Sequence, residues 1–301
     1  MKLDFTTLDV FTAERYQGNP LSIIRVPANL KSSLSQEQKQ IIAKEFNLSE
    51  IVFLHLPTDP NSVERNIDIF TSYAEVPFAG HPAVGTSFFL LNPPEAGRTI
   101  GDENVRTLIT KAGPISITPN GEGVKAIIPQ NFHRHTKSYT SPLIPGVENP
   151  ICSIVKGMSF IYVELPDLAM LAKVTAQDGN LESNPYTGCN DLDEGWREGL
   201  VGTMYFVDQG LDANGERKYR TRMIASREDP GTGSASSGLG CYLALRNWGH
   251  GRRTEKFRFT QGVEMGRRNE IAVEVEVEEG VVKEVLLGGE AVVVMEGSLE
   301  I

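Results

Sequence analysis

The stretch Glu75-Val-Pro-Phe-Ala-Gly-His-Pro-Ala-Val-Gly85 recurs later in the chain as Glu228-Asp-Pro-Gly-Thr-Gly-Ser-Ala-Ser-Ser-Gly238. Both copies read Glu-x-Pro-x-x-Gly, and the match extends without a gap from residues 50–90 to residues 203–243, at an offset of 153 positions (228 − 75). The alternative is chance similarity between two strand, loop and helix units. A repeat near half the chain length predicts two similar domains, because solenoids consist of many short repeats.

Each copy has the pattern of two strands followed by a helix. A run rich in β-branched and aromatic residues, a polar turn and a second such run precede the Glu-x-Pro-x-x-Gly motif. The expected helices cover Pro82–Leu90 and Ala235–Arg246. Pro is tolerated at the first helical position and Ser is a favoured N-cap, so Pro82 and Ser234 mark the predicted helix starts.

Three further segments give local signals. Ser35 and Gln38 have the spacing of a capping box and predict a helix over Gln36–Phe46. The alternation in Ile271-Ala-Val-Glu-Val-Glu-Val277 predicts a half-buried antiparallel strand. Residues 129–150 are rich in Pro, Ser, His and Asn without periodicity, which is typical of a linker. We therefore expect domains over residues 1–130 and 131–301, with the terminal strand able to cross to the first domain.

Composition and charge limit the partners and the compartment. The 301 residues carry a formal net charge of −10, and the basic residues are dispersed rather than gathered into a large patch. A nucleic-acid or membrane-surface partner is therefore not expected. The chain has no secretory pattern at its start and no apolar run of about 20 residues. Cys152, Cys189 and Cys241 have no CxxC spacing, so we expect a cytoplasmic protein without a disulfide framework.

The repeated loops place glycine-bearing backbone at two predicted helix N-termini. There the unpaired N–H groups and the helix dipole favour an anion. Two such loops on similar domains could hold one small carboxylate across a cleft, although glycines in a single loop more often serve only tight turns. Glu50 begins its strand in the first copy, whereas Thr203 takes its place in the second. This asymmetry predicts that one domain supplies the proton-transfer group.

Other site chemistries have weaker support. Neither loop reads G-x-G-x-x-G or precedes Gly-Lys-Ser/Thr, and a G-x-S-x-G motif is absent, so nucleotide-binding and nucleophile-elbow signatures are missing. A hydrolytic triad of Ser234, His81 and Asp229 stays open as an alternative. His133 and His135 have no carboxylate or cysteine near them in the sequence and lie in the predicted linker. We expect them to be solvated and predict no metal site.

Several blocks together resemble the phenazine-biosynthesis PhzF-like isomerase family. They occur in the family's order and cover most of the chain: Asp9-Val-Phe-Thr12, Gly18-Asn-Pro-Leu21, Asn47-Leu-Ser-Glu50, Pro77–Thr86, Glu228–Ser234, Gln261-Gly262 and Met265-Gly-Arg267. The resemblance implies a diaminopimelate-epimerase-like α+β fold with two pseudo-symmetric domains, each a curled antiparallel sheet around a central helix. Gly231 departs from the family, which often has Ala at this position.

The resemblance also implies an activity and a set of site residues. It assigns the general acid/base to Glu50, supporting catalytic roles to His81, Asp229 and Ser234, and substrate contacts to Asn19, Gly80 and Gly233. The expected activity is cofactor-independent proton transfer on a small carboxylate in the inter-domain cleft, by a homodimer. Racemases of this fold use one cysteine in each loop, which both loops here lack, so a two-thiol mechanism is disfavoured. The alternative function is a non-catalytic carboxylate-binding protein on the same fold.

Overall fold

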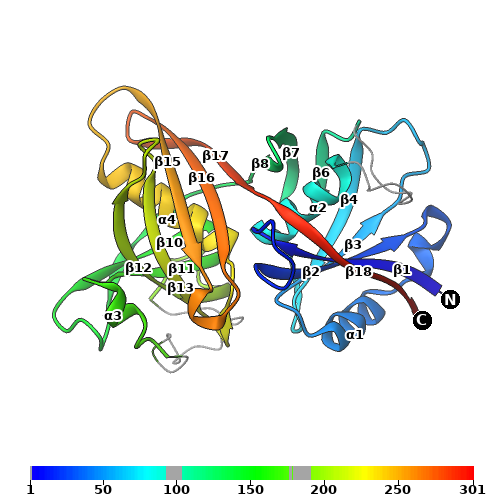
Figure 1. Ribbon diagram of the computed structural model, residues 1–301, viewed down its shortest axis with the longest axis horizontal. Helices are drawn as coiled ribbons and strands as arrows, with labels where there is room; N and C mark the ends of the chain where they lie inside the picture. Colours follow the sequence, from blue (N-terminus) through cyan, green and yellow to red (C-terminus); the bar gives the residue numbers. More distant parts are fainter. Residues whose placement is uncertain (1, 93–103, 176–177, 179–190) are drawn as a thin grey trace. The chain divides into compact units, whose positions relative to one another are not determined.

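The computed structural model describes residues 2–92, 104–175, 178 and 191–301 (Figure 1). The chain divides into two compact units. Unit 1 contains Met1–Pro129 and Leu287–Ile301, and unit 2 contains Gln130–Leu286. Each unit has its own group of paired strands and its own buried helix, and strand pairing joins the two groups into one continuous sheet.

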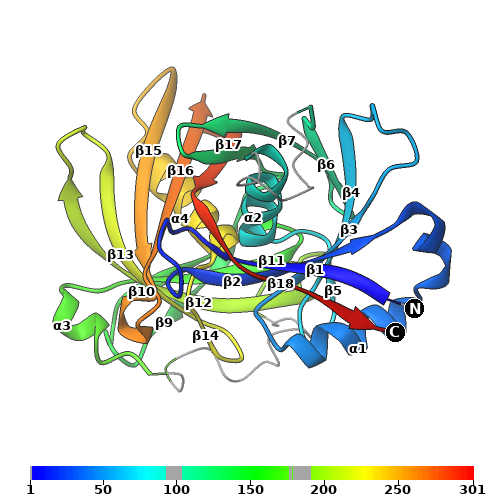
Figure 2. The same ribbon diagram turned by 45° about the vertical axis from the view of Figure 1, so that its right-hand side comes forward.

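Unit 1 combines the N-terminal half of the chain with its last strand. Its elements are β1 (Lys2–Val10), β2 (Asn19–Val26), η1 (Ala28–Ser33), α1 (Gln36–Phe46), β3 (Ile51–His55), β4 (Glu64–Phe70), β5 (Glu75–Val76), α2 (Gly80–Leu91), β6 (Thr107–Thr110), β7 (Gly113–Asn120), β8 (Gly123–Ile127), the end of β17 (Val281–Gly289) and β18 (Ala291–Glu300). Figure 2 shows β18 beside β1, and their antiparallel register pairs Lys2 with Glu300. The two chain ends therefore lie together in unit 1.

The sheet of unit 1 is mixed rather than purely antiparallel as expected. The pairs β2–β3 and β4–β6 are parallel, whereas β1–β2, β3–β4, β6–β7 and β7–β8 are antiparallel. Parallel neighbours need a crossover connection. Helix α1 lies in the connection between β2 and β3, and α2 lies in the connection between β4 and β6. The α+β class is confirmed, and these two crossovers explain the parallel pairs.

Helix α2 forms the core of unit 1. All but one of its residues are buried, and it contacts β1 and β2 as well as β7 and β8. Because these strands come from opposite ends of the pairing order, the sheet curls around the helix. Gly85 permits the close approach, since a Cβ there would lie 2.5 Å from Leu21 Cδ2 and 2.7 Å from Val10 Cγ2.

Unit 2 has a second group of paired strands around a second buried helix. Its elements are β9 (His133–Thr140), β10 (Glu148–Val155), β11 (Gly157–Glu164), α3 (Leu168–Leu171), β12 (Gly199–Leu211), β13 (Arg217–Ile224), β14 (Glu228–Asp229), α4 (Gly233–Arg246), β15 (Arg252–Gln261), η3 (Val263–Met265), β16 (Asn269–Glu278) and the start of β17. Helix α4 contacts β10 and β11 as well as β15 and β16. Gly238 faces Tyr162, whose hydroxyl would lie 2.2 Å from a Cβ at this position.

The pairings in unit 2 follow the same order as those in unit 1. The pairs β11–β12 and β13–β15 are parallel, and β10–β11, β12–β13 and β15–β16 are antiparallel. The register also recurs at the offset of the sequence repeat. Ile51 pairs with Phe70 in unit 1, and Met204 pairs with Met223 in unit 2. The aligned stretches of sequence thus form the same strand pair in both units.

The structure confirms the predicted helix before Asn47 but contains a strand where the sequence predicted a linker. The helix over Gln36–Phe46 is confirmed, with a capping box between Ser35 and Gln38 and with Asn47 in a left-handed conformation after its end. The predicted linker is wrong, because strand β9 crosses it and pairs with β10. Only His135 of this strand is buried, and most of the other residues are polar and face solvent. The sequence of β9 therefore lacks the alternation of apolar and polar residues by which a strand is recognised.

Two further expectations concern cysteines and membrane spans. Cys152 and Cys241 are buried thiols, and Cys189 lies outside the described residues. Burial raises the pKa of Cys152 to about 12 and also raises the pKa of Cys241. Such thiols are poor nucleophiles, because the thiolate is the reactive form.

None of the helices in the described ranges is long and apolar enough to cross a membrane.

Candidate active site

The two buried helices begin earlier than the sequence suggests. Helix α2 starts at Gly80, with Ala79 as N-cap, and α4 starts at Gly233, with Thr232 as N-cap. The predictions of Pro82 at the first helical position and of Ser234 as N-cap are therefore wrong. Glycine has poor intrinsic helix propensity, which concealed these starts. As a result, the predicted substrate contacts Gly80 and Gly233 lie in first turns, where N–H groups have no intrahelical acceptor.

Glu50 and His81 meet in unit 1. Glu50 lies immediately before β3, and His81 is the second residue of α2. His81 Nδ1 is 2.9 Å from Glu50 Oε2, and the two side chains are 3% and 19% exposed. Oε2 of Glu50 and Nε2 of His81 are buried and make no hydrogen bond within the described residues. The pair thus combines ion-pair distance with polar atoms that still have bonding capacity.

Asn19 occupies the first position of β2 and is completely buried. Strand β2 runs parallel to β3, with Ser22 beside Ile51. Because parallel strands begin at the same edge of a sheet, Asn19 and Glu50 both lie toward the edge where β2 and β3 start.

Asp229 and Ser234 lie on one loop of unit 2. Asp229 ends β14, and Ser234 is the second residue of α4 and is 3% exposed. The Thr232 hydroxyl donates a hydrogen bond to Oδ2 of Asp229. The loop from Asp229 to Ser234 thus places a carboxylate and a hydroxyl near the N-terminus of α4.

Gln261 and Asn269 hold this loop, a role that sequence reasoning missed. Both are completely buried and are cross-strand partners at the end of the β15–β16 pair. Gln261 Nε2 donates to the Asp229 carbonyl at 2.8 Å, and Asn269 Nδ2 donates to the Pro230 carbonyl at 2.7 Å. The Gln-Gly pair was visible in the sequence as a family block, but its contact with the loop was not.

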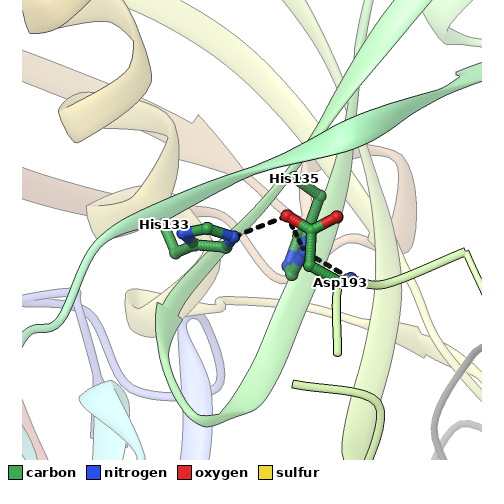
Figure 3. A group of neighbouring side chains, drawn as sticks. All are labelled: His133, His135 and Asp193. Carbon is green, nitrogen blue, oxygen red and sulfur yellow. Dashed lines mark hydrogen bonds and ion pairs between the residues drawn. The ribbon is translucent and has the colours of Figure 1, made fainter. Parts of the chain in front are cut away.

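A second polar cluster contains His133, His135 and Asp193 in unit 2 (Figure 3). Nε2 of His133 is 2.8 Å from Oδ2 of Asp193. His135 is buried, and its ring lies 4.8 Å from that of His133. The expectation of two solvated histidines without a carboxylate nearby is therefore wrong, because Asp193 reaches them from a distant part of the sequence.

The polar atoms of His135 and Asp193 have hydrogen-bond partners within the protein. Nδ1 of His135 accepts from the Asp193 backbone N–H at 3.1 Å, so its Nε2 carries the proton and donates to Ser153 Oγ at 2.8 Å. Asp193 also accepts from the Thr136 hydroxyl at 2.6 Å. The atoms of His133, His135 and Asp193 that could bind a metal ion lie within 4.8 Å of one another. However, binding through Nδ1 of His135 would need the lone pair that already accepts the hydrogen bond from the Asp193 backbone N–H.

Comparison with known proteins identifies the family. Residues 8–142 and 150–297 match the model of phenazine biosynthesis-like (PhzC-PhzF) proteins. The chain belongs to this family. An uncharacterized isomerase of Pasteurella multocida is 30% identical over 97% of this chain and 92% of its own length. The trans-2,3-dihydro-3-hydroxyanthranilate isomerase of Pseudomonas aeruginosa is 27% identical over 87% of both chains.

Solved structures agree with the family at the level of the fold. A PhzF-family phenazine biosynthesis protein of Bacillus anthracis has a TM-score of 0.69 and 21% identity over the whole of both chains. A probable proline racemase of Agrobacterium radiobacter has a TM-score of 0.63 and 14% identity over 99% of this chain and 93% of its own. With isomerases among the relatives that span most of its length, this PhzC-PhzF member is an isomerase.

Proposed function

We propose that this family member catalyses a cofactor-independent isomerisation of a small carboxylate, in which Glu50 removes a proton from one carbon of the substrate and delivers it to a second position on the same molecule. The observation that carries the proposal is the buried contact between Glu50 and His81 at the first turn of α2. A partly buried carboxylate beside an imidazole is a common arrangement for general acid/base catalysis.

Two half-sites would act on one substrate. The first consists of Glu50, Gly80 and His81, and the second of Asp229, Gly233 and Ser234. We infer that these groups belong to pseudo-symmetric domains and share the substrate between them. The matched helix starts support this inference, because each offers first-turn N–H groups to an anion. Such donors would bind the carboxylate and stabilise the negative charge that develops when the proton leaves.

The chemistry divides between the half-sites. In the first, Glu50 takes and returns the proton, and His81 orients the carboxylate through Nδ1. In the second, Asp229 and Ser234 contact polar groups of the substrate, and Asn19 adds a contact from the start of β2. The two helix starts, and the P. aeruginosa relative that is named for a hydroxyanthranilate derivative, support a small carboxylate as the substrate class. Small cyclic and amino carboxylates are therefore the compounds to examine first.

The test is solvent-isotope exchange. The protein is incubated in deuterated buffer with a panel of small cyclic and amino carboxylates, and each compound is analysed for a gain in mass. We expect exchange into at least one compound, and the Glu50→Gln variant should exchange it about 10²- to 10⁴-fold more slowly while binding is retained. Glu122→Gln is the matched control, because Glu122 is an exposed residue of the same unit.

The alternative is a carboxylate-binding protein without catalysis. Binding of a panel compound that survives Glu50→Gln, with no exchange by the unmodified protein into any compound, would favour the alternative and contradict the proposed isomerase reaction.

A further inference from the structure

The side-chain amide of Gln261 is fixed in one orientation against the loop from Asp229 to Ser234. Oε1 accepts from the Thr232 backbone N–H at 3.1 Å, while Nε2 donates to the Asp229 carbonyl at 2.8 Å. Reversing the amide would place a donor against a donor and an acceptor against an acceptor. The backbone of the loop therefore determines which end of the amide faces the Thr232 hydroxyl.

This orientation also sets the direction of the Thr232 hydroxyl. Nε2 of Gln261 lies 3.0 Å from Thr232 Oγ1 and can only donate to it. The hydroxyl accepts this bond and has its own proton left to donate. That proton goes to Oδ2 of Asp229, which accepts from the Thr232 hydroxyl. A one-way chain of donors thus runs from Gln261 through Thr232 to Asp229.

Burial restricts the movement of the residues that make this series of hydrogen bonds. Gln261 is completely buried and Thr232 is 8% exposed. Asn269 supports it from the neighbouring strand by donating to the Pro230 carbonyl at 2.7 Å, so two consecutive loop carbonyls are held by side-chain amides. Both ends of the Gln261 amide have partners, and a buried amide that is bonded at both ends is held in a single arrangement.

We propose that Gln261 is a positioning residue for the isomerase reaction, which it supports by directing the Thr232 hydroxyl onto Asp229 and so fixing how that carboxylate faces the substrate. The proposal rests on the proposed function, in which Asp229 contacts the substrate. Gln261 itself acts only through Thr232. A small misplacement of a catalytic group costs up to about 10²-fold in rate.

The kinetic test uses variants that alter the chain with little change in shape. Gln261→Glu replaces the donating amide nitrogen by an acceptor, which redirects the Thr232 hydroxyl away from Asp229. Thr232→Val removes the hydroxyl without introducing a charge, and Thr232→Ser retains it. We expect Gln261→Glu and Thr232→Val each to lower kcat by roughly 10- to 100-fold with KM unchanged. Thr232→Ser should keep most of the activity.

Two comparisons separate positioning from a loss of structure. The double variant should be no slower than either single variant, because both changes break the same chain. Gln209→Glu is the matched control, since Gln209 is an exposed residue of the same unit, and it should retain full activity. Wild-type kcat in Thr232→Val, or additive losses in the double variant, would overturn the proposal.

Neutron diffraction of the deuterated protein locates the hydrogens in the bonds from Gln261 through Thr232 to Asp229, and it needs no substrate. The deuteron on Thr232 Oγ1 should point to Oδ2 of Asp229 in the unmodified protein and to the new carboxylate in Gln261→Glu. A deuteron that points elsewhere in the unmodified protein would overturn the proposal about Gln261. A correct deuteron in a protein that exchanges no compound would instead show that the proposed isomerase function is at fault.

Discussion

Nδ1 of His81 lies 2.9 Å from Oε2 of Glu50, in a contact between the first turn of α2 and the residue that precedes β3. The second ring nitrogen of His81 is buried without a hydrogen bond in the described part of the chain. Buried polar atoms without partners are uncommon in folded proteins, and each one calls for an explanation. A bound substrate that supplies the missing partners is the explanation that the proposed function offers.

The contact predicts a graded response to substitution of His81. His81→Asn can place an amide donor near the position of Nδ1 and keep Glu50 oriented, whereas His81→Leu cannot. We expect His81→Leu to lower kcat by about 10²-fold and His81→Asn to lose less. Steady-state kinetics on a compound found by isotope exchange measures both. Equal kcat values for His81→Leu and the unmodified protein would show that the histidine has no role in the reaction.

The resemblance to the PhzF-like family leads us to expect alanine at position 231, and the position of Asn269 favours the glycine that this chain has instead. A Cβ on Gly231 would lie 2.2 Å from Oδ1 and 2.6 Å from Cγ of Asn269. Asn269 cannot move easily, since its Nδ2 donates to the carbonyls of Pro230 and Arg267 at 2.7 Å each. We expect Gly231→Ala to reduce the free energy of unfolding by about 1–3 kcal/mol.

Chemical denaturation measures the effect of Gly231→Ala against a control in open space. Gly249→Ala should be neutral, because a Cβ there meets no atom of the described residues within 4 Å. Adding Asn269→Ser to Gly231→Ala should cost less than the two single changes together. Strict additivity would count against the predicted clash.

Asp68 links Lys39 of α1 to His55 of β3 and should stabilise unit 1. Its Oδ2 lies 2.5 Å from Lys39 Nζ and 2.8 Å from His55 Nε2. Burial opposes ionisation of the carboxyl, but the hydrogen bonds from His55 and Lys39 outweigh it and hold the pKa of Asp68 at about 2. Because the folded-state pKa lies below the ordinary 3.8, this stabilisation is present above about pH 4 and is lost as the pH falls toward 2.

The variant Asp68→Asn leaves Lys39 buried without its carboxylate. We expect a loss of roughly 3 kcal/mol at neutral pH, measured by urea denaturation, and a weaker dependence of stability on pH between 4 and 2. Asp191→Asn is the control, because the Asp191–Lys137 pair is exposed and should contribute less than about 1 kcal/mol. A loss no larger than that of the control would contradict this account.

His135 should make the stability of the protein sensitive to mild acid. Its burial, together with the neighbouring His133, lowers its pKa below the ordinary 6.5 despite the opposing charge of Asp193. The unfolded chain therefore binds a proton at higher pH than the folded chain. Stability from the neutral ring is fully present above about pH 6.5 and falls as the pH drops below that value.

The slope of melting temperature against pH tests this prediction. We expect a decline from pH 7 to 5 that is smaller in His135→Asn, which cannot titrate there. His250→Asn should leave the slope unchanged, because His250 is exposed. A slope in His135→Asn equal to that of the unmodified protein would refute the assignment to His135.

Sequence reasoning succeeded where the determining contacts are local. The helix over Gln36–Phe46 followed from residues three positions apart, and its capping box is present in the structure. The repeat predicted matching strand pairs, and the register of Ile51 with Phe70 and of Met204 with Met223 agrees with it. The capping box and the pattern of the strands can be recognised in the sequence, because both depend on residues that are close together along the chain.

Contacts between distant residues could not be read from the sequence. Gln261 bonds to residues 29 and 32 positions earlier, and Asp193 bonds to His133 across 60 positions. The polar strand β9 resembled a linker because it buries only His135. Composition describes single residues, whereas these features depend on which strands become neighbours after folding.

The most direct measurement is the rate at which the unmodified protein and Glu50→Gln transfer solvent deuterium into a small carboxylate. We expect exchange by the unmodified protein and a rate about 10²- to 10⁴-fold lower in the variant, with the compound still bound. Equal exchange rates in the two proteins would contradict the assignment of the proton to Glu50.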